Sequence, residues 1–198
     1  MSPIWPAGLL ATAQRLAGAS AGPGRPALGD LRLATSTAYY ALFHQIARDG
    51  SFDFLPGASE ENAATIARWY THTGVLTAAG LLVDASSTKQ IKKPNITSVT
   101  VLRSSAGGEI NPRLVAVAEA FQSLQQARHS ADYDGNYDPV RAVTLQHVED
   151  CQTALDACRW LWQSGELRRR DESREAANGS YRVFLRLALL NSSGPRAR

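Results

Sequence analysis

Apolar residues recur every three or four positions over most of this chain, which is the spacing of helices that bury one face. The longest such stretch in the N-terminal half runs from about 26 to 49. A shorter stretch at 5–18 gives way to a segment with two Gly and two Pro, which predicts a first helix and a turn. A third stretch, at 60–82, follows Ser59, and Ser is a favoured helix N-cap. The N-terminal half therefore predicts three helices.

Two Asx-Pro pairs mark the expected helix starts in the second half of the chain, because Asn or Asp suits the N-cap and Pro suits the first helical position. Asn111 and Pro112 precede a long apolar stripe, and Asp138 and Pro139 precede another that ends at about 163. Residues suited to turns lie between the two stripes. We therefore expect two long helices that meet at a corner.

The segment 84–112 loses helical periodicity and contains two Pro, two Gly and all three lysines. It predicts a long inserted loop, with a short hairpin around 97–103. Loops of this length inside a compact domain tend to be functional or mobile. Its candidate contacts to a nucleic-acid backbone are Lys89, Lys92, Lys93 and Arg103, with a merely solvated loop as the alternative.

The C-terminal part is a mixed charge run at 166–179, followed by a short amphipathic stretch at 181–190 that carries Arg182 and Arg186 on one face. This stretch caps the bundle or packs on a partner. We expect the last seven residues to be disordered.

The composition is that of a soluble globular protein, with 44% hydrophobic and 20% charged residues in 198. The elements above therefore predict an all-α protein with a single core. No stretch approaches eighteen apolar residues, and the opening segment lacks a basic start before an apolar run, so we expect a cytoplasmic protein. Cys151 and Cys158 lie too far apart on one helix for a disulfide, and we expect both to be buried thiols.

The net charge of +3 comes from eighteen Arg and three Lys against eighteen acidic residues. Arginine suits phosphate recognition, but so small a surplus is only weak support for a nucleic-acid partner. The sequence has no Gly-rich phosphate loop and no metal-binding spacing, so we expect neither a metal nor a cofactor.

The densest chemistry lies at the expected corner, in the sequence RHSADYD at 128–134. It holds a fixed cation, an imidazole that titrates near neutrality, a phenol and two carboxylates. These are the side chains of Arg128, His129, Tyr133, Asp132 and Asp134. The cluster is typical of a functional site or of a solvated helix end with local ion pairs, and composition alone leaves both open.

The predicted helix at 26–49 adds two phenols and another imidazole. Tyr39 and Tyr40 point about 100° apart on a helix, so at most one lies at the centre of any face. His44 follows Tyr40 by one turn, so the two can share a site, although a packed histidine is the alternative. We expect His72 to serve packing, because no residue near it in the sequence pairs with it.

Two motifs together resemble the HEPN superfamily. They are LRLATSTAYYALFHQIA at 31–47 and RHSADYD, in this order and followed by a further long helix. The resemblance extends over about 5–163. It implies an up-and-down bundle of four to five core helices that dimerises, with the polar motif of each protomer near the interface.

The resemblance also implies a division of the chain. A HEPN-like helical domain spans 1–165, with 84–112 as an insertion. A charged extension spans 166–198, with a short helix and a disordered end.

Many HEPN proteins are metal-independent endoribonucleases of toxin–antitoxin, phage-defence or RNA-processing systems. The resemblance therefore implies an RNA substrate, a homodimer, and no metal or cofactor. The catalytic pattern of these enzymes is Arg, a polar residue, several further positions and then His. Arg128 and His129 match its start, whereas Tyr133 stands where the shortest spacing would place the later His.

Cleavage of RNA without a metal needs a base for the 2′-hydroxyl, a cation for the charge on phosphorus and an acid for the leaving oxygen. Arg128 supplies the cation, His129 the base or acid, and Tyr133 a hydrogen-bond donor. A two-fold axis would bring a second copy of these groups into the same groove. The expected supporting residues are Asp132, Asp134, Tyr39, Tyr40 and His44.

The alternative is a non-catalytic HEPN module that binds a nucleotide, RNA, an antitoxin or a partner nucleotidyltransferase. In that interpretation Asp132 pairs with Arg128 or Arg32, and Tyr133 packs beneath the helix at 26–49.

Two further possibilities carry less weight. A helical interaction protein would use the 181–190 stripe to bind its partner. The spacing from Arg141 to His147 matches the catalytic pattern literally, but about one such match is expected by chance among so many arginines.

Overall fold

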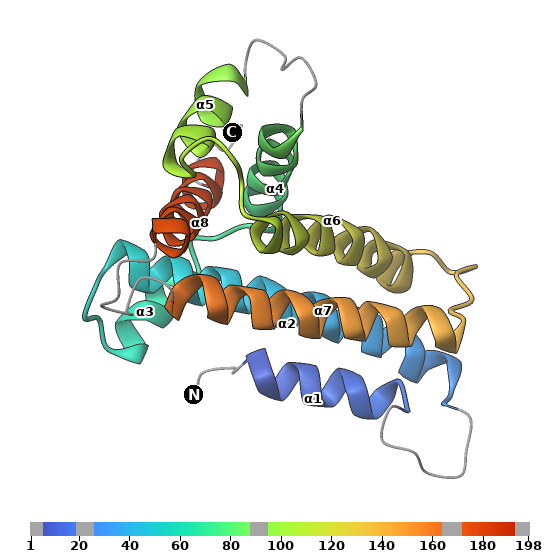
Figure 1. The fold of residues 1–198 in the computed structure, drawn as a ribbon. Helices are drawn as coiled ribbons and strands as arrows, with labels where there is room; N and C mark the ends of the chain where they lie inside the picture. The colour runs from blue at the N-terminus through green and yellow to red at the C-terminus, as the bar shows by residue number, and fades with distance from the viewer. Residues whose placement is uncertain (1–5, 19–25, 88–94, 164–171, 193–198) are drawn as a thin grey trace, which may run out of the picture.

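The computed structural model describes residues 6–18, 26–87, 95–163 and 172–192, and these residues form eight α-helices (Figure 1). The all-α prediction is therefore confirmed. The helices are α1 (Pro6–Leu16), α2 (Leu28–Phe54), α3 (Glu60–Ala67), α4 (His72–Ser86), α5 (Ile96–Ser105), α6 (Pro112–Tyr133), α7 (Arg141–Gln163) and α8 (Glu172–Ser192). None of these helices is both long and apolar enough to cross a membrane.

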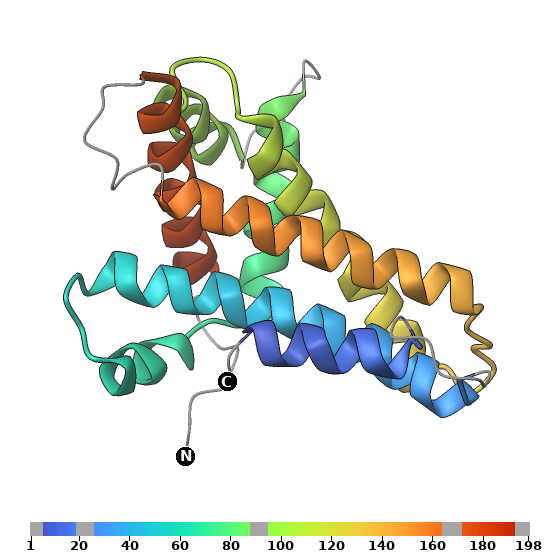
Figure 2. The same cartoon turned by 60° about the horizontal axis from the view of Figure 1, so that its bottom comes forward.

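The bundle has two directions of packing. Helices α1, α2 and α7 lie lengthwise beside one another, and α4 and α8 cross them at a steep angle (Figures 1 and 2). Helix α6 packs on α2, α7 and α4, so it joins the two sets. The C-terminal end of α6 therefore lies beside α2 and α7.

Helix α2 is the central element, because it contacts α1, α3, α6, α7 and α8. Its small residues, such as Ala34, Ala38 and Ala41, are fully buried and let neighbouring helices approach closely. The predicted end at 49 is wrong, because α2 continues to Phe54. The added turn is stable because its buried polar groups are satisfied: Ser51 donates to the carbonyl of Ala47 (2.6 Å).

The helix predicted at 60–82 is two helices, α3 and α4, with a break at 68–71. Thr71 caps α4 by accepting from the backbone N–H of Gly74 (3.1 Å). Its own N–H donates to Ser192 Oγ on α8 (2.9 Å), which anchors the first turn of α4. This break places His72 at the start of a helix instead of in the middle of one.

The prediction of a hairpin around 97–103 is wrong, because Ile96–Ser105 forms helix α5. Val99 and Leu102 are fully buried, so this segment joins the core through one helical face. Arg103 donates to the carbonyls of Ala85 (2.9 Å) and Ser87 (2.6 Å), where α4 ends. Its guanidinium is therefore used to tie α5 to α4. The other predicted nucleic-acid contacts, Lys89, Lys92 and Lys93, lie outside the described residues.

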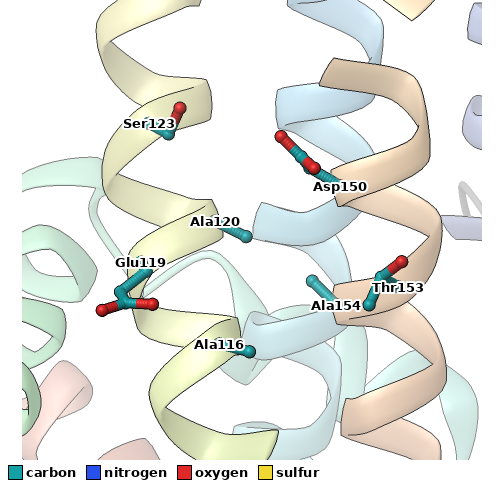
Figure 3. A pocket seen from close by; sticks show the side chains of 7 residues that line it. All are labelled: Ala116, Glu119, Ala120, Ser123, Asp150, Thr153 and Ala154. Atoms are coloured by element: carbon teal, nitrogen blue, oxygen red, sulfur yellow. The ribbon is translucent and has the colours of Figure 1, made fainter. Parts of the chain in front are cut away.

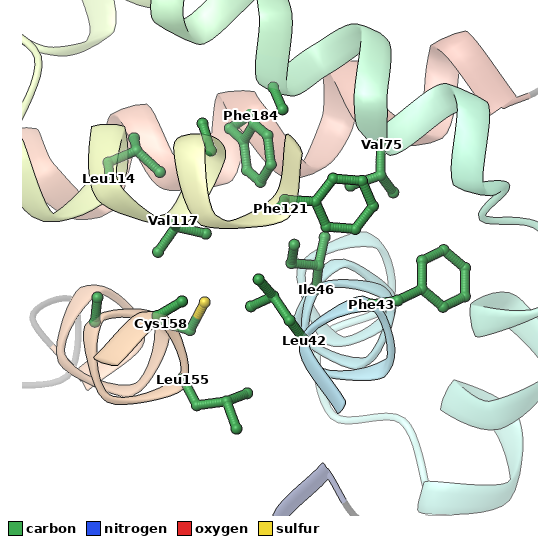
Figure 4. Packing of buried hydrophobic residues seen from close by; sticks show 14 of the residues in the cluster. Leu42, Phe43, Ile46, Val75, Leu114, Val117, Phe121, Leu155, Cys158 and Phe184 are labelled. Carbon is green, nitrogen blue, oxygen red and sulfur yellow. The ribbon is translucent and has the colours of Figure 1, made fainter. Parts of the chain in front are cut away.

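Helix α8 completes the core and is longer than the short stretch predicted at 181–190. The side chains of Tyr181, Phe184, Leu185 and Ala188 are fully buried. Figure 4 shows Phe184 beside core residues of α6, with α2 and α7 across the same core. The stripe is therefore buried within the chain, which contradicts its use as a docking face. The predicted disordered end, from residue 193, lies outside the described residues.

Both cysteines are free and buried in this core, as predicted. Burial raises the pKa of the Cys151 thiol to about 12, so it stays protonated. Cys158 is labelled in Figure 4 among the apolar side chains that surround it.

Candidate functional site

The residues 128–134 form the last turns of α6 and its C-cap, so the predicted corner is present. The N–H of Asp134, the C-cap, donates to the carbonyl of Ser130 (3.1 Å), which is the spacing of a helical hydrogen bond. The Asp134 carboxylate accepts from the N–H of Asn136 (2.9 Å), which shapes the turn towards α7. Asp134 is therefore a structural residue of the corner.

Arg32 on α2 holds this corner in place. Its guanidinium donates to the carbonyls of Ala131 (2.8 Å), Tyr137 (2.9 Å) and Asp134 (2.6 Å). A cation at a helix C-terminus is favourable, because the free carbonyls there carry partial negative charge. The pairing of Arg32 with Asp132 that the sequence left open is not present.

Arg128 is the centre of the cluster, and four side chains position it. Its Nε lies 2.6 Å from Oδ2 of Asp132, which is the predicted ion pair. Its Nη2 donates to the hydroxyls of Tyr40 (2.8 Å) and Tyr133 (3.4 Å). The guanidinium carbon also lies 5.3 Å from the Tyr40 and Tyr133 ring centroids and 5.8 Å from that of Tyr39. These are cation–π distances, so three aromatic rings surround one cation.

Asp132 links Arg128 to α2. Its second carboxylate oxygen accepts a hydrogen bond from Ser36 Oγ, and Ser36 is a buried residue of α2. Desolvation alone would lower the pKa of Arg128, but the neighbouring Tyr40, Asp132 and Tyr133 raise it above its ordinary value. Arg128 is therefore a fixed cation, with 17% of its side chain exposed.

Tyr133 and His129 form the exposed side of the cluster. Tyr133 is 66% exposed, so the expectation that it packs beneath α2 is wrong. The rings of His129 and Tyr133 lie 5.2 Å apart, which puts an imidazole beside the group that holds Arg128.

Tyr39 and Tyr40 diverge, as their spacing predicts. Tyr39 is fully buried, and its hydroxyl lies 2.7 Å from Nδ1 of His72. Tyr40 is partly exposed and bonds Arg128. His44 extends the group, with its ring 6.3 Å from that of Tyr40.

His72 is the member of this cluster that the sequence interpretation missed. It lies 33 residues from Tyr39 along the chain, and the break before α4 brings it there. The prediction that it only packs is therefore incomplete. Burial first, then Arg128 and His44, lower its pKa, and burial also lowers the pKa of His44. Both shifts favour the neutral imidazole.

The remaining candidates lie outside this cluster. Arg141 donates to the carbonyls of Ala17 (3.4 Å) and Gly18 (2.8 Å), so its guanidinium fixes the end of α1 and makes no pair with His147. A groove of about 290 Å³ lies between α6 and α7 (Figure 3). Its lining residues are Ala116, Glu119, Ala120, Ser123, Asp150, Thr153 and Ala154, none of which belongs to the cluster. Within the described ranges, no three His, Cys, Asp or Glu side chains lie close enough together to hold a metal ion.

The cluster thus combines a fixed cation, hydrogen-bonding phenols, imidazoles and a partly exposed surface. This set can bind a phosphate group and move protons beside it. Comparison of the chain with known protein families, with curated proteins and with solved structures finds no match.

Proposed function

We propose that the Arg128 cluster is an RNA site and that the protein is a HEPN-type, metal-independent endoribonuclease. The observation that carries this proposal is the arrangement of Arg128, held by Tyr40, Tyr133 and Asp132, with the His129 ring packed against the ring of Tyr133. A planar guanidinium recognises phosphate oxygens. Asp132 and the two phenols engage Nε and Nη2 of Arg128, whereas Nη1 makes no hydrogen bond within the described residues and is the nitrogen that a phosphate oxygen can reach.

The proposed reaction is an internal transesterification. The RNA 2′-oxygen attacks phosphorus, the bond to the 5′-oxygen breaks, and a 2′,3′-cyclic phosphate and a 5′-hydroxyl end result. A base takes the 2′-hydroxyl proton, and an acid gives a proton to the leaving oxygen. Arg128 stabilises the charge that develops on the phosphoryl oxygens. His129 is the base or the acid, because it is the exposed imidazole beside Arg128.

A second copy of the chain would supply the partner of His129 in this reaction. Apolar side chains flank the corner and face solvent: Tyr133, Val140 and Val143 are 66%, 62% and 47% exposed. Such residues favour an isologous contact between two copies, which would bring two Arg128 and two His129 side chains together. The dimer is part of the proposal.

The test is cleavage of a mixed RNA pool in EDTA. We expect the wild type to cleave and Arg128→Ala to lose about 100-fold or more in rate, in line with the loss of one charge-stabilising group. The matched control is Arg159→Ala. Arg159 also pairs with an aspartate on its own helix, Asp156 (2.6 Å), but lies on α7 away from the cluster. Undetectable cleavage by concentrated wild type would refute the proposal.

One observation favours a second function, a non-catalytic module that binds RNA, a nucleotide or a partner such as an antitoxin or nucleotidyltransferase. Asp132 already pairs with Arg128, and no His follows Arg128 at four to six intervening residues. This function predicts that a 2′-O-methyl RNA and ordinary RNA bind equally and that neither is cleaved. Toxicity of the wild type on expression, lost in Arg128→Ala, would count against it.

A further inference from the structure

A hydrogen-bonded pair lies beneath Arg128 and has no part in the cleavage step described above. We propose that one member of this pair, His72, is a positioning residue: through Tyr39 it fixes the aromatic bed on which the Arg128 guanidinium rests. The catalytic meaning of this inference rests on the proposed function. Whether His72 immobilises Arg128 can be measured without an assay of RNA cleavage.

Both rings that lie beneath Arg128 on α2 are in contact with His72. Tyr39 bonds Nδ1 of His72 through its hydroxyl (2.7 Å). Tyr40 meets the edge of the imidazole with centroids 5.8 Å apart and an interplanar angle of 71°. Phe43 packs against the imidazole at 4.2 Å between centroids. One imidazole from α4 therefore supports the two α2 rings that carry a cation from α6.

The direction of the hydrogen bond depends on which tautomer the neutral His72 adopts. Burial raises the pKa of Tyr39 far above neutrality, so its hydroxyl keeps its proton and donates it. Burial and the neighbouring cation lower the pKa of His72, which favours the neutral imidazole. In the arrangement that we propose, Nδ1 of this imidazole accepts from Tyr39 and Nε2 carries the proton. The pair thus holds one tautomer of His72.

Protonation of His72 would disrupt this arrangement in two ways. It would remove the acceptor that Tyr39 uses, and it would put a second positive charge near Arg128. The titratable and charged groups that face His72 are Tyr39, Tyr40 and His44 on α2 and Arg128 on α6. None of these is an anion that would stabilise an imidazolium. On α8, the side chain near the first turn of α4 is the neutral Ser192.

The test uses three substitutions that separate the hydrogen bond from the packing. His72→Asn keeps an oxygen acceptor near the position of Nδ1, His72→Leu removes it, and Tyr39→Phe removes the donor. The control is His147→Asn, because His147 is a partly buried histidine on α7 whose pKa is also lowered by burial. Thermal melts followed by circular dichroism establish which variants are folded.

The primary measurement is the exchange of the Arg128 Nε proton with water, by ¹⁵N-resolved NMR at one fixed pH. We expect His72→Leu and Tyr39→Phe each to accelerate exchange by about tenfold. Each variant loses the hydrogen bond between Tyr39 and His72, and a tenfold change corresponds to the free energy of about one such bond. The double variant should show no larger effect, and His72→Asn should stay near the wild type. Unchanged exchange in Tyr39→Phe, or additive effects in the double variant, would overturn the inference.

The second measurement is the rate of RNA cleavage in EDTA by the same variants. A positioning role predicts lower kcat with little change in the affinity for a 2′-O-methyl RNA, and recovery in His72→Asn. If the wild type does not cleave at all, the proposed function fails, and the exchange measurement still decides whether His72 positions Arg128.

Discussion

Asp49 is a buried carboxyl, and its shifted pKa should make the free energy of unfolding depend on pH. Its two oxygens accept hydrogen bonds from Tyr181 (2.8 Å) and Gln45 (2.8 Å). Burial outweighs these bonds and raises its pKa from 3.8 to about 6. The folded chain therefore holds a proton that the unfolded chain has released between these two pH values, so stability falls as pH rises through this window.

The substitution Asp49→Asn tests whether this carboxyl causes the stability to fall as pH rises. The amide removes the buried charge and can still accept from Gln45 while its nitrogen donates to the Tyr181 oxygen. We expect the free energy of unfolding of the variant, relative to that of the wild type, to rise by about 2–3 kcal/mol from pH 4 to pH 7. One pKa unit corresponds to about 1.4 kcal/mol. Urea denaturation at several pH values measures the difference. A difference that does not change with pH would contradict it.

Contacts of single residues were predictable only where they are local in sequence. The pair of Arg128 and Asp132 spans one helical turn, so spacing alone indicates it. The bond between Tyr39 and His72 joins two helices and has no such signal. The same is true of Asp49, where the helical stretch was predicted to end, whereas a contact with α8 makes it part of the core.

At the scale of elements, two glycines of α2 give a matched pair of substitutions. Gly29 has open space where a Cβ would lie, whereas a Cβ at Gly50 would lie 1.9 Å from the Tyr70 hydroxyl. Tyr70 is buried, and its hydroxyl donates to the carbonyl of Leu185 (3.3 Å), so it has little room to move.

We therefore expect Gly50→Ala to destabilise the fold by about 1–3 kcal/mol, as overpacking does. Gly29→Ala should be neutral or stabilise it by less than about 1 kcal/mol, because Ala favours helix more than Gly does. Chemical denaturation compares the two variants. Equal effects would show that the close contact between α2 and Tyr70 is absent in solution.

Helical periodicity predicted most of the helices but not their ends. The break at 68–71 was missed because it contains neither Gly nor Pro, and Thr71 marks it only through its capping bond. Helix α5 was missed because its many β-branched residues favour a strand, while burial of Val99 and Leu102 selects a helix. Such tertiary contacts override local propensity.

At the scale of the whole molecule, the C-terminal helix is a part of the fold and not an appendage. Helix α8 packs on α2, α4, α5 and α7. Besides its buried apolar face, it supplies Arg186, which donates to Asp53 (2.8 Å), and Arg182, 3.5 Å from the same carboxylate. The Asp53 side chain is only 1% exposed, so it depends on these cations.

This dependence gives a prediction about where the chain can be shortened. A chain that stops at residue 163 keeps α1 to α7 but leaves the Asp53 carboxylate without Arg182 and Arg186 and uncovers the core beneath α8. We expect it to lose cooperative unfolding and to aggregate. A chain that stops at residue 192 keeps every described helix and should unfold like the full chain. Calorimetry of the two truncations measures this, and a stable, cooperative fold in the shorter chain would show that α8 is dispensable.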